Sequence, residues 1–317
     1  MKLVQDKIMV AGGTGFLGQR VVKRLKEDSY SFVTTSRSQG VDFRDLSQTS
    51  NFFEKEKPTI LMNCAAYVGG IKFGFEHEGE IYYNNTLINL NLFECARMYG
   101  LKRIVNPIAN CSYPDVVNKD FKEEEWWNGP LNRTVLVYGF VKKGTWVLST
   151  AYRKQYKLDT VNLIVPNMYG PGDHFEEVRS HALGALATKI VKAKEENIPE
   201  VVVWGTGKPV REWLYVDDCA EAFVRSLSIP EMDEPMNIGR REGISIFDLA
   251  MLIKKIVGYK GNLVCDTSKP DGAPYKVMGI EKMRQVFKWV PPTKIEDGIK
   301  KTIKWYYQDI IKKEVVL

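Results

Sequence analysis

The stretch Gly12-Gly13-Thr14-Gly15-Phe16-Leu17-Gly18 decides the fold of this chain of 317 residues. It follows the apolar run Ile8–Ala11 and opens a segment, 16–26, in which apolar residues recur at helical spacing. The glycines permit a tight turn and let backbone N–H groups approach a pyrophosphate, toward which the helix directs the positive end of its dipole. The stretch predicts a strand, a dinucleotide-binding turn and a helix; the alternative is a turn with a purely structural role. The residues expected to hold the cofactor here are Gly12, Gly15, Phe16, Leu17 and Gly18.

The rest of the first half repeats this pattern of short apolar runs and longer amphipathic segments. The runs lie at 31–35, 59–65, 103–109 and 160–166, with helical patterns between them at 48–55, 80–98 and 138–156. Alternating strands and helices are typical of a parallel sheet that is covered by helices on both faces. The sequence therefore predicts an α/β fold with a doubly wound, parallel Rossmann sheet.

Beyond residue 166 the alternation loosens and Pro and Gly become frequent. Helical patterns recur at 182–196, 217–228 and 246–257. Parallel sheets bind ligands beyond the carboxyl ends of their strands. We therefore expect 1–166 to form the dinucleotide-binding domain and 167–317 to form a smaller α/β domain that binds the substrate, with room for segments that return to the first sheet.

Composition narrows the class of protein. Hydrophobic residues make up 44% and charged residues 26%, as in ordinary globular enzymes, and the net charge of +6 suits a small anionic substrate better than nucleic acid. Basic residues near the C-terminus, such as Lys300 and Lys304, are expected on the solvated face of an amphipathic helix rather than on a membrane. The five cysteines are widely spaced and no pair has metal-ligand spacing, which favours reduced thiols, no metal site and a cytoplasmic protein. No apolar run reaches the length of a membrane span, and the first residues are too polar for a signal peptide.

The end of the second predicted strand bears on the choice of cofactor. Thr34-Thr35-Ser36-Arg37-Ser38 carries no carboxylate, and Arg37 stands 19 residues after Gly18. An acidic residue here favours NAD, whereas an Arg accommodates the additional phosphate of NADP. Ser36 and Arg37 therefore predict NADP(H) over NAD(H). The alternative is that Arg37 is only a charged residue of a surface loop. Asp42 and Asp45 are close enough in sequence to bind the ribose of NAD(H), so NAD(H) stays possible as the cofactor.

Tyr138 and Lys142 stand four residues apart in a predicted helix, so they share one face. A free tyrosine has a pKa of about 10, and bringing it to neutrality requires a preference for the phenolate of roughly 4 kcal/mol. The ammonium of Lys142 and a positive nicotinamide ring both favour the phenolate. We expect Tyr138 to act as the acid/base of hydride transfer and Lys142 as its partner. A Tyr and a Lys four residues apart are common in helices, where they usually form a surface pair. The catalytic interpretation is favoured here because the chain also carries the glycine-rich turn.

Further motifs resemble the extended short-chain dehydrogenases, and within them the GDP-L-fucose synthases, over nearly the whole chain. The motifs that carry the resemblance are 65–71 (AAYVGGI), 110–114 (NCSYP), 167–171 (NMYGP), 204–213 (WGTGKPVREW), 216–218 (VDD) and 269–272 (KPDG). The resemblance implies an enzyme that epimerises carbons 3 and 5 of a GDP-4-keto-sugar and then reduces the ketone with NADPH.

The resemblance also implies roles for single residues. Cys111 and His181 match the acid/base pair of the epimerisation, and we expect neighbouring cations or a helix end to depress the pKa of Cys111. A buried thiol and a loop histidine are the structural alternatives. The cofactor would also contact Ala65, Ala66 and Lys142. The substrate would contact Asn167, Trp204, Lys208, Arg211 and Lys269. Pairing of two chains through the helices near 80–98 and 138–156 would give a homodimer.

Two positions depart from the family pattern. Ala109 stands where the family has Ser or Thr, and it cannot donate a hydrogen bond to the substrate carbonyl. Asn110 or Ser112 could supply this hydrogen bond instead. If the strand continued through them, however, alternation would direct their side chains differently from that of residue 109. Gly279 replaces a usual Asp. Three functions stay open: an epimerase-reductase with a rearranged oxyanion contact, a carbon-4 oxidoreductase of a GDP-hexose or GDP-heptose, and a non-catalytic dinucleotide-binding protein.

Overall fold

A computed structural model describes residues 6–115, 119–176, 180–269 and 271–311. Within these residues, the main sheet has six parallel strands in the order β2-β1-β3-β4-β5-β9. The strands are β1 (Ile8–Ala11), β2 (Phe32–Thr35), β3 (Ile60–Asn63), β4 (Arg103–Ala109), β5 (Asp159–Val165) and β9 (Met236–Asn237). β1, β3 and β5 are buried along most or all of their length, because helices cover both faces of the sheet. The predicted doubly wound parallel sheet is confirmed.

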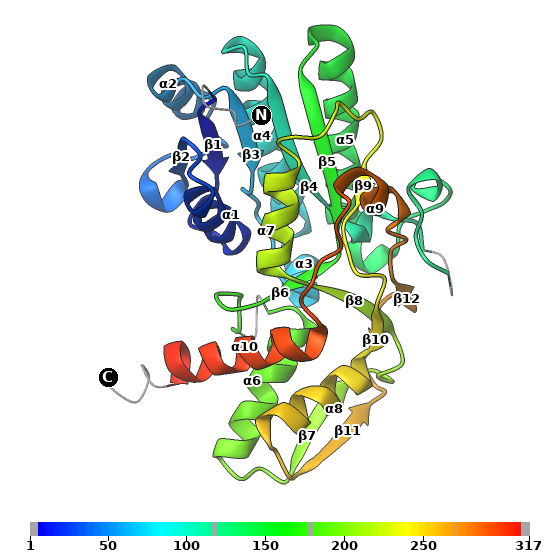
Figure 1. The fold of residues 1–317 in the computed structure, drawn as a ribbon. Helices are drawn as coiled ribbons and strands as arrows, with labels where there is room; N and C mark the ends of the chain where they lie inside the picture. The colour runs from blue at the N-terminus through cyan, green and yellow to red at the C-terminus, as the bar shows by residue number, and fades with distance from the viewer. Residues whose placement is uncertain (1–5, 116–118, 177–179, 270, 312–317) are drawn as a thin grey trace.

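Helices form one layer on each side of this sheet (Figure 1). α1 (Phe16–Glu27) and α7 (Val216–Arg225) pack on one face, where Leu17, Val21 and Phe223 join the core. On the other face lie α2 (Leu46–Glu56), α4 (Glu78–Met98) and α5 (Leu136–Tyr156). α7 and β9 come from the second half of the chain and return to the first sheet. The boundary at residue 166 between two domains stays a prediction.

The remaining elements gather beyond the carboxyl ends of the strands (Figure 1). β6 (Asn167–Tyr169), β8 (Val210–Tyr215), β10 (Gly243–Ser245) and β12 (Tyr275–Lys276) form a small mixed sheet, while β7 (Glu200–Trp204) pairs with β11 (Asn262–Asp266). α6 (Ala182–Glu195), α8 (Ile246–Val257) and α10 (Ile295–Tyr306) pack around a second apolar core. The shorter helices are α3 (Ile71–Glu76) and α9 (Glu281–Phe287). None of the helices in the described part of the chain has the length and apolar character needed to cross a membrane.

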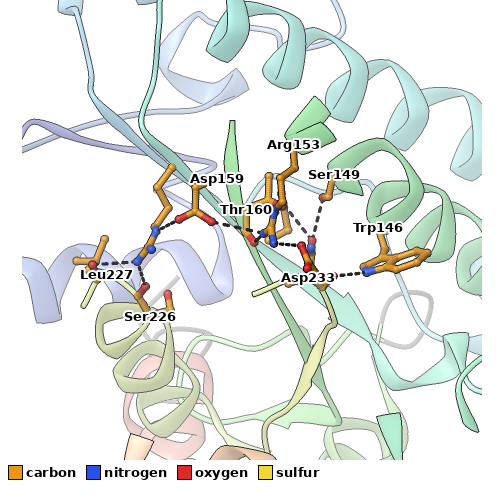
Figure 2. A network of polar contacts seen from close by, with 11 residues as sticks. Trp146, Ser149, Arg153, Asp159, Thr160, Ser226, Leu227 and Asp233 are labelled. Carbon is orange, nitrogen blue, oxygen red and sulfur yellow. Dashed lines mark hydrogen bonds and ion pairs between the residues drawn. The ribbon is translucent and has the colours of Figure 1, made fainter. Parts of the chain in front are cut away.

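A polar network ties α5 to the amino ends of β4 and β5 (Figure 2). The Asp159 carboxylate pairs with Arg103 and also with Arg153 on α5. Arg153 pairs further with Asp233, in the segment that leads to β9. Arg103 donates to the backbone carbonyls of Ser226 and Leu227, which follow α7. The network holds the C-terminal half of α5 in place, at the end of the helix remote from Tyr138.

Candidate active site

The glycine-rich turn has the close contacts that a phosphate-binding backbone requires. Gly12 has a left-handed backbone (φ +77°), and a Cβ atom on it would lie 2.8 Å from the backbone of Ala65. A Cβ on Gly18 would lie 2.1 Å from the carbonyl oxygen of Gly12. Gly15 caps α1, so the free N–H groups of the first turn of that helix face the turn. These residues fit the pyrophosphate of a dinucleotide, and Phe16 and Leu17 pack the start of α1 into the core.

Three hydroxyl groups meet beside this turn, at the end of β2. Thr14 Oγ1 lies 2.8 Å from Ser36 Oγ and 3.1 Å from Ser38 Oγ, and the two serine hydroxyls are 3.0 Å apart. Arg37 is exposed, with 75% of its side chain accessible, and only a 4.0 Å contact links it to Asp42. The Asp42 carboxylate instead binds the guanidinium of Arg44, and hydrogen bonds from Arg44 lower its pKa to about 2.

A row of asparagine side chains supports the loop that begins at Cys64. Asn63, Asn106 and Asn162 stand on three neighbouring strands: Asn63 donates its amide to Asn106, at 3.4 Å, and Asn106 donates to Asn162, at 3.3 Å. Asn63 also donates to Asn89 on α4, at 3.1 Å, and accepts from the backbone N–H of Ala65, at 3.3 Å. The row fixes the loop with Ala65 and Ala66 against the glycine-rich turn. The alternation of apolar and helical segments predicted these strands, but no motif in the sequence marks the three asparagines.

Tyr138 and Lys142 lie in the first two turns of α5. The Lys142 ammonium donates to the carbonyl oxygen of Pro107, at 3.0 Å, and lies 5.4 Å from the centre of the Tyr138 ring. Burial lowers the pKa of Lys142 to about 8. Burial raises the pKa of Tyr138 above its usual value, and the charge of Cys111 raises it further. The protein's own groups therefore do not produce the expected lowering of the Tyr138 pKa, because burial and Cys111 both raise it.

Cys111 lies in a short 3-10 turn, Asn110–Ser112, directly after β4. This turn contacts the start of α5, since a Cβ on Gly139 would lie 2.7 Å from the Cys111 carbonyl oxygen. Cys111 acts on the pKa of both Tyr138 and Lys142, and the Lys142 ammonium lies 5.4 Å from the Tyr138 ring centre, so the structure brings these three side chains together. The expected depression of the Cys111 pKa is wrong: burial raises it, and the ammonium groups of Lys276 and Lys142 offset only part of that rise.

His181 is half-buried at the residue that precedes α6. Burial lowers the pKa of its imidazole, and the charge of His174 lowers it further. A Cβ on Gly184 would lie 2.9 Å from the carbonyl oxygen of His174, so the segment before α6 folds back closely on the first turn of the helix. Among the described residues, no hydrogen bond or ion pair joins His181 to Tyr138, Lys142 or Cys111.

Lys276 is a site residue that the sequence analysis missed. It stands on β12, paired in register with Arg211 on β8. Burial lowers the pKa of Lys276, and its charge interacts with Cys111, Arg211 and Asp115. No spacing in the sequence indicates this, because only the pairing of β12 with β8 brings Lys276 to the turn after β4.

Three of the residues expected to contact the substrate lie at the end of β7 and on the loops that follow β7 and β11: Trp204, Lys208 and Lys269. The backbone N–H and hydroxyl of Thr206 bind the two carboxylate oxygens of Asp271, at 2.9 and 2.7 Å, and so join the loop after β7 to the loop after β11. Trp204 is 54% exposed. The ammonium groups of Lys269 and Lys189 lie 5.8 and 5.1 Å from its ring centre. Lys189, on α6, is a second cation that the sequence analysis did not select. Lys208 is exposed on the first of these loops.

Arg211 and Asn167 lie nearer the sheet. Burial lowers the pKa of Arg211 to about 10, and a Cβ on Gly272 would come within 2.9 Å of its guanidinium. Asn167 begins β6, half-buried, and pairs in register with Trp213. Glu212, beside Arg211, is fully buried and accepts backbone N–H groups of Arg240, Arg241 and Met278, at 2.6 to 2.9 Å. The described residues contain no cluster of His, Cys, Asp or Glu suited to a metal ion.

The family model "NAD dependent epimerase/dehydratase family" matches residues 8–239, which include the glycine-rich turn, Cys111, Tyr138 and Lys142. The chain belongs to the NAD dependent epimerase/dehydratase family. Among its relatives, the chain is 34% identical to the putative GDP-L-fucose synthase 2 of Arabidopsis thaliana, over 97% of this chain and 94% of that protein. It is 30% identical to the GDP-L-fucose synthase of Escherichia coli, over 96% of this chain and 98% of that one.

Solved structures of the epimerase family agree with this placement. A GDP-L-fucose synthetase from Naegleria fowleri superposes with a TM-score of 0.85 at 28% identity, covering 96% of this chain and 94% of that one. A GDP-mannoheptose C4 reductase from Campylobacter jejuni, with NADP bound, gives a TM-score of 0.86 at 26% identity, covering 97% and 100%. The resemblance inferred from the motifs is confirmed.

Proposed function

We propose that this chain is an NADP-dependent epimerase-reductase that acts on a GDP-4-keto-sugar. The observation that carries the proposal is the meeting of Tyr138, Lys142 and Cys111 at the carboxyl end of β4 and the start of α5. This group combines the acid/base pair of a carbonyl reductase with a thiol that can exchange a proton beside the carbonyl. The similarity to GDP-L-fucose synthases over nearly the full length supports the same activity.

Tyr138 is the proton donor of the reduction. Because burial raises its pKa, the phenol holds its proton at neutral pH and can give it to a ketone oxygen. Lys142, anchored on the Pro107 carbonyl, places a positive charge beside the phenol and favours the phenolate that forms. Bound NADPH supplies the hydride, and its oxidised ring supplies a further positive charge beside the site.

Cys111 and His181 serve the epimerisation, in which protons beside the ketone are removed and returned. The raised pKa keeps Cys111 as a thiol and the lowered pKa keeps His181 neutral at pH 7. In this resting state Cys111 can give a proton and His181 can take one. Lys276, whose ammonium acts on the same thiol, stabilises the thiolate after the proton has left.

The nucleoside diphosphate of the substrate binds over the second half of the chain. The Arg211 guanidinium and the exposed Lys208 offer positive charge to a diphosphate. The exposed ring of Trp204, with Lys189 and Lys269 beside it, offers a stacking surface for the base. Asn167 contacts the sugar from the start of β6.

NADP(H) is the preferred cofactor. Three hydroxyls and the exposed guanidinium of Arg37 gather at the end of β2, where a 2′-phosphate would bind. The Asp42 carboxylate accepts hydrogen bonds from Arg44, so it is not available to bind the ribose of NAD. NADP bound to a structural relative is consistent with this preference.

The chain is proposed to form a cytoplasmic homodimer through α4 and α5. These helices lie together on one face of the sheet and expose several large apolar side chains. The exposed residues are Tyr82, Tyr83, Leu90 and Met98 on α4, and Leu136, Phe140, Val147 and Tyr156 on α5. A patch of this kind on neighbouring helices marks an interface between proteins.

A reductase of carbon 4 that does not epimerise is the second candidate. Ala109 offers no hydrogen bond to a carbonyl oxygen, so the enolate of an epimerisation lacks one of the family's stabilising contacts, and an enzyme that only reduces has one such charged intermediate fewer to stabilise. The Campylobacter jejuni relative named as a GDP-mannoheptose C4 reductase fits this candidate. A non-catalytic protein needs neither Tyr138 nor Lys142, and their contact argues against that function.

The test is an assay of purified enzyme with GDP-4-keto-6-deoxymannose and NADPH. We expect NADPH oxidation in step with formation of a GDP-sugar that is two mass units heavier, carrying the inverted configuration at carbons 3 and 5. A product reduced at carbon 4 alone would support the second candidate. No oxidation of NADPH would reject both.

A further inference from the structure

The turn after β4 supplies few free hydrogen-bond donors to the reacting carbonyl. Ala109 has none. Ser112 Oγ donates to the Ala109 carbonyl, at 2.6 Å, and accepts from Trp126 Nε1, at 2.8 Å. The Tyr113 hydroxyl donates to Asn237 Oδ1, at 2.8 Å. Both hydroxyl groups are therefore committed to contacts inside the protein, and neither can replace the missing donor at position 109.

Asn110 differs from these neighbours. Its side chain is 4% exposed, and its Nδ2 atom is buried without a hydrogen-bond partner among the described residues. A buried amide donor that stays unpaired costs folding free energy, so native proteins rarely keep one without a use. The donor lies one residue after Ala109 and one residue before Cys111.

The backbone allows Asn110 to serve the site. β4 ends at Ala109, and Asn110–Ser112 forms a 3-10 turn, in which side chains no longer alternate between the two faces of a sheet. The expectation that alternation directs Asn110 away from the site therefore does not apply. Contacts to the catalytic residues lie on both sides of it: the Pro107 carbonyl accepts from Lys142, and Cys111 interacts with Tyr138.

We infer that the carboxamide of Asn110 donates a hydrogen bond to the substrate's carbonyl oxygen, in place of the hydroxyl that Ala109 lacks. The inference rests on the proposed function. In the reduction, hydride adds to the carbonyl carbon, the π electron pair moves to oxygen, and that oxygen takes the proton of Tyr138. Asn110 transfers no proton. It stabilises the charge on oxygen in this step, and on the enolate oxygen during epimerisation.

Two opposite effects of substitution distinguish this role from a structural one. Asn110→Leu removes the donor at nearly constant size, and we expect kcat for ketone reduction to fall by about 10²–10³, with the Kd of NADPH unchanged. Because Asn110 Nδ2 has no partner to lose among the described residues, the urea midpoint of Asn110→Leu should equal or exceed that of the parent. Ser112→Ala is the matched control: it removes a paired hydroxyl of the same turn and should lower the midpoint.

A rescue variant tests the identity of the missing group. Ala109→Ser places a hydroxyl one residue earlier. The double variant Ala109→Ser/Asn110→Ala should have a kcat at least tenfold higher than that of Asn110→Ala alone. Parental kcat in Asn110→Leu would overturn the inference, and so would a urea midpoint well below the parent's, which would mean a paired, structural amide. If the proposed function is wrong, the parent enzyme will show no turnover with the ketone. The comparison of urea midpoints between Asn110→Leu and the parent does not depend on turnover.

Discussion

The ammonium of Lys142 lies 5.4 Å from the centre of the Tyr138 ring, one turn further along α5, and donates to the carbonyl oxygen of Pro107. The same ammonium influences the pKa of Cys111. One lysine thus links the phenol proposed for reduction with the thiol proposed for epimerisation.

Tyr138→Phe should separate catalysis from cofactor binding. The variant keeps the ring and loses the proton that the ketone oxygen receives, so turnover should fall by roughly 10²–10⁴. The Kd of NADPH, measured by fluorescence titration, should change less than threefold, roughly 0.6 kcal/mol. Unchanged turnover would remove Tyr138 from the mechanism.

The reduction should lose rate at alkaline pH. Burial lowers the pKa of Lys142 to about 8, so the ammonium is complete below this pH and is lost as the pH rises through it. We expect log kcat/KM to fall above about pH 8 with a slope of one per pH unit. Lys143→Met is the control, since burial also lowers the pKa of Lys143 to about 8 but its ammonium lies over the rings of Trp126 and Trp127. An alkaline limb that disappears in Lys143→Met would contradict the assignment to Lys142.

Arg37→Ala should weaken NADP binding by about tenfold, or about 1.4 kcal/mol, because the 2′-phosphate loses a hydrogen bond from a charged donor. The Kd of NAD should stay the same, because it lacks the 2′-phosphate. Arg284→Ala is a matched control, since Arg284 is an exposed arginine on α9, which packs near β9 at the opposite edge of the sheet from β2. Equal affinities of the parent for NADP and NAD would contradict the preference.

Val147→Glu should convert the proposed homodimer into a monomer. Val147 is 49% exposed on α5, two helical turns beyond Phe140, and a carboxylate there would be buried without a partner in the dimer. Light scattering at micromolar concentration measures the mass. Met251→Glu on α8, where Met251 is 44% exposed, should leave the mass unchanged. A monomeric parent would refute the dimer.

The sequence predicted the main sheet well, because helices bury both faces and leave strands such as β1 as continuous apolar runs, here at 8–11. Strand signals were weak for β6, β10 and β12, which have two or three residues each and depend on pairing with β8. For the same reason Lys276 was missed: its place beside Arg211 comes from tertiary pairing.

The pKa values and directions of site side chains were harder to predict than the places of these residues in the fold. The turn that carries Cys111 lies where the motif suggested, but the pKa of its thiol is raised and not depressed, because burial outweighs the nearby ammonium groups. Alternation also failed one residue beyond Ala109, where a 3-10 turn replaces the strand. Both differences arise from packing around α5, which local sequence does not encode.

Exchange of solvent deuterium into the substrate tests the central claim most directly. The enzyme is incubated with GDP-4-keto-6-deoxymannose in heavy water with NADPH omitted, and deuterium at each carbon is measured by NMR. The account predicts incorporation at carbons 3 and 5, suppressed more strongly in Cys111→Ser than in Tyr138→Phe. An enzyme that reduces the ketone with NADPH yet incorporates no deuterium would contradict it, and would leave a carbon-4 oxidoreductase in which Cys111 and His181 only bind.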